Sequence, residues 1–132
     1  MRVEDEYMDV LQNIEVGVVD TYQDHPEMSD HDVLRVFEAV MDVYKAERVG
    51  REPRHAPFTP AEADLFETVR ATCDWRLGRD SALSVDEPEG APVPTITVDE
   101  VLLCLKRLVK SVKTWSKEGG RRGYLDFIVQ YV

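Results

Sequence analysis

Cationic side chains recur every three or four residues near the C-terminus, beginning at Lys106. At 100° per residue, the four lysines of residues 106–117 fall within about 60° of arc and form a ridge about 16 Å long. Two arginines follow in the segment GGRRG, residues 119–123. Unpaired amides and the positive dipole at the start of the next helix favour an anion there. The residues predicted to bind an anion or an acidic partner are Lys110, Lys113, Lys117, Arg121 and Arg122.

The charge distribution leaves a simpler explanation of this ridge open. The 132 residues carry a net charge of -10, yet residues 101–132 hold seven basic and two acidic side chains. The ridge is thus equally consistent with a solvated face or with pairing to acidic helices of the same domain. The overall charge argues against broad attraction to nucleic acid or anionic lipid. Binding of nucleic acid or a phosphate ligand by the ridge remains an alternative, although the chain has no Walker lysine motif.

A second cluster of chemically capable residues is the sequence DHPEMSDHD, residues 24–32. Imidazole and carboxylate groups bind zinc, manganese or iron, which makes His25, His31 and Asp32 weak candidates for metal ligands in a hydrolase. The His31-Asp32 pair resembles the metal-binding dipeptide of HD phosphohydrolases. Such a site needs further ligands from separate helices, and the remaining histidine, His55, lies in a predicted loop. Polar loop residues and a helix cap are the simpler interpretation.

Covalent catalysis has little support in the sequence. Cys73 and Cys104 lie on or beside apolar stripes, where thiols are usually buried and unreactive. No serine lies in a glycine-flanked strained turn, and no Cys-x-x-Cys pair is present. We therefore expect a protein that is not an enzyme and that has no cofactor.

The elements that carry these residues are predicted to be helices. Apolar residues recur at spacings of three and four over residues 4–23, 33–44, 65–77, 101–115 and 124–131. Ser29, Thr59 and Thr97 precede three of these stretches and are predicted helix caps. The sequence predicts an all-α fold, a bundle of four long helices plus a short C-terminal fifth, in one domain over residues 1–132. Residues 79–96 are predicted to form a flexible loop.

Apolar groups on a second helical face predict an interface. Trp75 falls away from the main stripe of its helix, and Leu125 and Val132 fall off the line of Tyr124. Such faces need a second surface to cover them. We expect a homodimer, with Trp75 and Tyr131 as the apolar interface candidates.

Three stretches carry a resemblance to a known group of proteins. They are YQDHPEMSDHDVLRVFEAVMDVY, CDWRLGR and WSKEGGRRGYLDFIVQYV. They resemble a family of short, uncharacterised helical proteins of bacteria, common in cyanobacteria and their neighbours. The resemblance implies a bacterial cytosolic helical protein and nothing catalytic.

The longest apolar run, at residues 101–105, is far shorter than the roughly 20 residues that span a bilayer. The acidic start of the chain lacks the order of a signal peptide, which predicts a cytoplasmic protein without membrane contact. The sequence thus predicts a cytoplasmic interaction or binding module, whose partner is an acidic protein or a small anion.

Overall fold

A computed structural model of the protein describes residues 3–79 and 96–131, with side chains for 8–79 and 96–130. The helices are α1 (Val3–Asp24), α2 (Asp30–Val49), α3 (Pro60–Arg76), α4 (Val98–Gly119) and α5 (Gly123–Tyr131), and a short 3-10 helix, η1 (Gly120–Arg122), joins the last two. The described residues contain no strand. The predicted all-α class is confirmed.

Three helices begin at the caps that the sequence predicts. Ser29 precedes α2, and its backbone N–H donates to Asp32 at 2.9 Å. Thr59 and Thr97 precede α3 and α4, and each side-chain oxygen accepts the N–H of the glutamate three residues later at 3.2 Å. These reciprocal bonds satisfy amides that a helix start would otherwise leave unpaired. The helix starts are therefore fixed by local chemistry.

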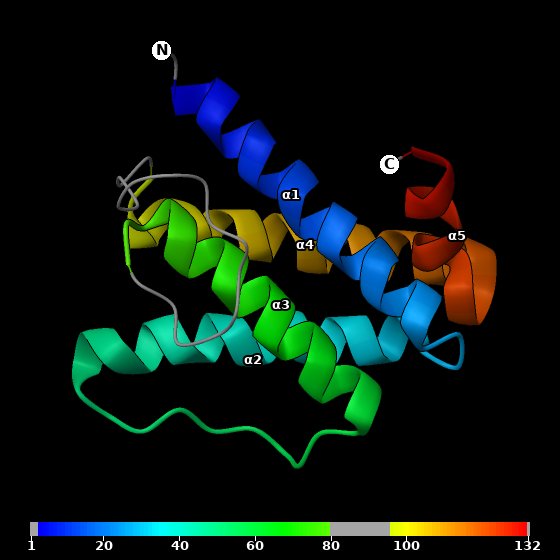
Figure 1. Cartoon of the computed structure of the whole chain (residues 1–132), viewed down its shortest axis with the longest axis horizontal. Helices are drawn as coiled ribbons and strands as arrows, with labels where there is room; N and C mark the ends of the chain where they lie inside the picture. The colour runs from blue at the N-terminus through cyan, green and yellow to red at the C-terminus, as the bar shows by residue number, and fades with distance from the viewer. Residues whose placement is uncertain (1–2, 80–95, 132) are drawn as a thin grey trace.

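The helices pack as two crossed pairs. In Figure 1, α1 and α3 run diagonally side by side, whereas α2 and α4 run across the molecule. The first pair approaches closely at Gly17, where an added Cβ would lie only 2.8 Å from Thr68 Cγ2. Gly17 therefore allows the backbones of α1 and α3 to approach, although a glycine inside a helix lowers its intrinsic stability.

The core contains most of the predicted apolar stripes. Two residues of the predicted stripes, Tyr7 in 4–23 and Tyr131 in 124–131, lie outside the residues whose side chains are described. Other stripe residues, such as Tyr22 and Phe66, are half-buried at the edge of the core. The buried members of the stripes are Leu11, Ile14, Val18, Val33, Phe37, Val40, Tyr44, Leu65, Val69, Cys73, Val101, Leu105, Leu108, Val112, Tyr124 and Ile128.

The segment GGRRG, which connects α4 to α5, is helical and contains η1. Gly120 has φ +77°, a left-handed conformation that glycine adopts without strain. At Gly123 an added Cβ would lie 2.2 Å from the carbonyl oxygen of Trp115, so only glycine fits. This close approach folds α5 back towards α4 and α1.

The predicted loop at 79–96 lies outside the described residues except at its two ends. Arg79 pairs with Glu47, and Ile96 is buried. Among the helices of the described residues, none combines the length and the apolar character needed to cross a membrane.

Candidate functional site

A hollow of about 550 Å³ lies where the first turn of α2 meets the end of α4 and η1. We call it the cationic hollow, because three of the predicted binding residues line it: Lys113, Lys117 and Arg121. His31, an exposed residue of α2, lines it as well. The other lining residues are Asp30, Leu34, Val112, Ser116 and Gly120. The hollow thus combines residues that lie about 80 positions apart in the sequence.

Asp30 is an acidic group in a cationic site, and the fold uses it as a structural acceptor. It is 2% exposed and accepts the Ser116 hydroxyl at 2.6 Å. It also accepts the backbone amides of Tyr124 at 2.8 Å and Leu125 at 3.1 Å. Its carboxylate therefore caps the start of α5 and ties the α2, α4 and α5 ends together. With its oxygens already bonded, Asp30 fixes the walls of the hollow.

The lysines of the chain have no acidic partner within the described residues. The ion pairs between described residues use arginines or a histidine, such as Arg35 with the buried Glu62 and Arg51 with Asp42. The Arg51 guanidinium lowers the pKa of the Asp42 carboxyl to about 2. Lys106, Lys110, Lys113 and Lys117 are all exposed. The pairing of the ridge with acidic helices, which the sequence left open, is therefore absent from the described residues.

Two of the predicted binding residues lie outside the cationic hollow. Lys110 is exposed on α4 and is not part of the lining. Arg122 donates from Nη2 to the carbonyl oxygen of Pro26 at 2.7 Å, and its Cζ lies 5.8 Å from the centre of the Tyr22 ring. Arg122 thus fastens η1 to the turn between α1 and α2. Sequence spacing alone did not separate Arg122 from its neighbour Arg121.

The weak metal-ligand candidates do not converge. His25 contacts Glu27 at 3.3 Å and Asp64 at 3.1 Å through its two ring nitrogens. Asp32 accepts from Ser29 in the cap of α2, whereas His31 lines the cationic hollow. In the part of the chain that the structure describes, no group of three or more His, Cys, Asp or Glu residues could hold a metal ion.

Of the two interface candidates, the structure describes the side chain of one. Trp75 is half-buried on α3, and the side chain of Tyr131 lies outside the described set. Leu125, which the sequence offered as surplus apolar surface, is completely buried in the chain's own core. Leu125 therefore needs no second chain to cover it.

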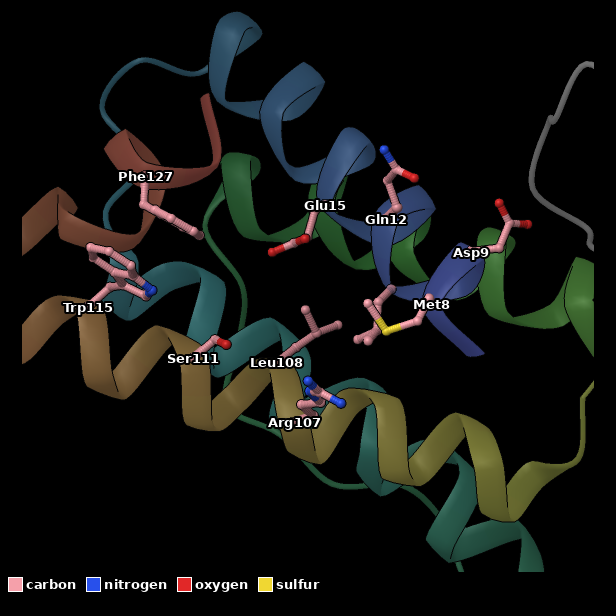
Figure 2. A pocket seen from close by; sticks show the side chains of 10 residues that line it. Met8, Asp9, Gln12, Glu15, Arg107, Leu108, Ser111, Trp115 and Phe127 are labelled. Carbon is pink, nitrogen blue, oxygen red and sulfur yellow. The ribbon is translucent and has the colours of Figure 1, made fainter. Parts of the chain in front are cut away.

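A second hollow, of about 530 Å³, lies between α1, α4 and α5, and sequence reasoning did not find it. Figure 2 shows Trp115 and Phe127 at one end, with Met8 and Arg107 farther along. The two aromatic rings stack with centroids 4.0 Å apart. The hollow exists because α1 diverges from α4 and packs mainly on α3, as Figure 1 shows. Only tertiary packing places these side chains together.

Glu15 extends from α1 into this second hollow (Figure 2) and is half-buried. Burial raises the pKa of its carboxyl, and a hydrogen bond from the Tyr124 hydroxyl at 3.0 Å partly opposes that rise. The cysteines offer no comparable group: both are fully buried, and burial raises the pKa of the Cys104 thiol to about 12. Neither thiol is set up as a nucleophile.

Comparison with known proteins adds no relative to this description. No protein-family model, curated protein or solved structure matches the chain.

Proposed function

We propose that this chain is a small binding module that holds an anionic group of a partner in the cationic hollow. In this proposal it is a bundle of four long helices and a short fifth, acts in the cytoplasm and is not an enzyme. The observation that carries the proposal is that Lys113, Lys117 and Arg121 line one hollow and have no acidic partner among the described residues.

The chemistry of these three side chains suits an anion. Two lysine amines supply mobile point charges, whereas the guanidinium of Arg121 supplies a planar pair of donors. Hydrogen bonds from such cations to carboxylate or phosphate oxygens are about twice as strong as neutral ones. Because the groups are exposed, added salt should weaken the interaction. A carboxylate of an acidic protein and a free anion would both satisfy this site.

The experiment compares two variants of equal charge. Fluorescein-labelled tetraglutamate is titrated at low salt against Lys113→Glu/Lys117→Glu and against the control Arg54→Glu/Lys110→Glu, whose two residues are exposed and lie outside the cationic hollow. We expect the first pair to weaken binding at least about tenfold, because both substitutions lie in the hollow, and the control by about threefold or less. Equal weakening by the two pairs would show attraction to general charge and would contradict a built site.

The homodimer that the sequence predicts is a second, separate part of the proposal. Its support is the half-buried Trp75, since Leu125 is covered within one chain. Sedimentation equilibrium distinguishes a mass of twice 15.1 kDa from that of the single chain. Trp75→Ala is expected to shift the mass towards the monomer, and an unchanged dimer would remove Trp75 from the interface.

No described contact favours the other two candidate functions. Nucleic-acid or phosphate-ligand binding would use the same cations without further recognition groups. A metal-dependent hydrolase would need His25, His31 and Asp32 to converge, and they serve three different contacts.

A further inference from the structure

A smaller hollow lies on the same helix pair as the cationic hollow. It measures about 160 Å³ and is lined by Glu38, Met41 and Lys45 of α2 and by Lys106 and Val109 of α4. The two helices run antiparallel, since the start of α2 meets the end of α4 in the cationic hollow and the end of α2 meets the middle of α4 here. The two hollows therefore follow one another along the seam between α2 and α4, which we call the α2–α4 groove.

The groove has regular walls. The lining includes residues 31, 34, 38, 41 and 45 of α2 and residues 106, 109, 113 and 117 of α4, with Asp30, Val112 and Ser116 beside them. This alternation of three and four residues places each set along one edge of its helix. At 1.5 Å per residue, the α2 wall is about 21 Å long, close to four helical turns. Two such antiparallel edges form the kind of surface that receives a third helix in a bundle.

The chemistry changes across the groove. Leu34, Met41 and Val109 are half-buried and pack against the core, so they form an apolar floor. The flanking cations are Lys45, Lys106, Lys113, Lys117 and Arg121, and Glu38 is the exposed acid of the lining. None of the five cations has an acidic partner within residues 8–79 and 96–130.

Resting on the proposed function, we infer that the α2–α4 groove binds an acidic amphipathic helix of a partner protein. The apolar floor takes one stripe of that helix, and the flanking cations take carboxylates on either side of the stripe. The partner is helical because both walls are α-helices whose interior amides and carbonyls are bonded within each helix. A helix bonds its own backbone groups, whereas an extended segment would find no backbone partner in these walls.

The probe is an 18-residue fluorescein-labelled peptide with leucines spaced three and four residues apart and glutamates between them. A scrambled peptide of the same composition keeps the charge and removes the stripe. We expect the patterned peptide to bind at least about tenfold tighter than the scrambled one, and its circular dichroism to become helical on binding. Equal affinities for the two peptides would overturn the inference and leave the anion site standing.

Variants separate the floor from the charges. Met41→Lys and, independently, Val109→Lys keep the groove cationic, and each should remove most of the preference for the patterned peptide while tetraglutamate still binds. The matched control is Met8→Lys, because Met8 is 48% exposed on α1 beside the other hollow. Unfolding curves identify any variant that fails to fold.

The remaining outcomes separate this inference from the proposed function. If the wild-type protein does not bind tetraglutamate, both the anion site and the groove are refuted. A preference that survives both floor variants would refute the groove alone. If the peptide instead competes with self-association in sedimentation, the occupant is a second copy of this chain, and the inference of an acidic helical partner is wrong.

Discussion

Asp30 is the residue on which the C-terminal half of the site depends. Its carboxylate accepts three hydrogen bonds, from Ser116 and from the first amides of α5. Asp30→Ala leaves these donors unpaired in a buried place and should lower the free energy of unfolding by about 3 kcal/mol. Urea unfolding measures this loss of free energy, and the exposed Asp20→Ala is the matched control. Equal free energies for the two variants would contradict the role assigned to Asp30.

Glu15 should make stability depend on pH in a defined direction. Burial raises the pKa of its carboxyl above the unfolded value, so ionised Glu15 opposes folding and protonated Glu15 does not. Glu15→Gln should therefore be more stable than wild type at pH 7, and this advantage should disappear by pH 3.5. Unfolding curves at both pH values test this, with Glu118→Gln as the exposed control. A variant that is equally destabilised at both values would assign Glu15 a packing role only.

At the scale of elements, α4 shows how one helix serves both the core and the site. Leu105 is completely buried, and the adjacent Lys106 is exposed. Leu105→Ala should cost about 2 to 5 kcal/mol through lost burial and a cavity, whereas Lys106→Ala should cost about 0.5 kcal/mol or less. Thermal or urea unfolding distinguishes them, and similar losses at both positions would contradict the orientation of α4.

The helices could be predicted from sequence because their signals are local. Apolar spacing and the caps at Ser29, Thr59 and Thr97 act within a few residues of one another. The joint between α4 and α5 could not be predicted, because it depends on a close approach of Gly123 to Trp115. A backbone contact of this kind, between two consecutive helices, leaves no periodic pattern in a single sequence.

For the molecule as a whole, the candidate site was predictable in part. The spacing of α4 identified Lys113 and Lys117, but it did not place His31 beside them across the fold. The segment GGRRG added Arg122 to the predicted site, although the guanidinium of Arg122 binds the α1–α2 turn. The hollow around Glu15 could not be predicted either, because it arises from the divergence of α1 and α4.

The most direct test of the anion site is a titration of the assigned ¹⁵N–¹H amide spectrum with tetraglutamate. The cationic hollow predicts that the largest and saturable shifts belong to amides of His31, Lys113 and Gly120 and that they weaken with salt. Amides of Gln12 and Ser111, in the other hollow, should move little. Largest shifts at Gln12 and Ser111, or small shifts spread evenly over the molecule, would contradict anion binding at the cationic hollow.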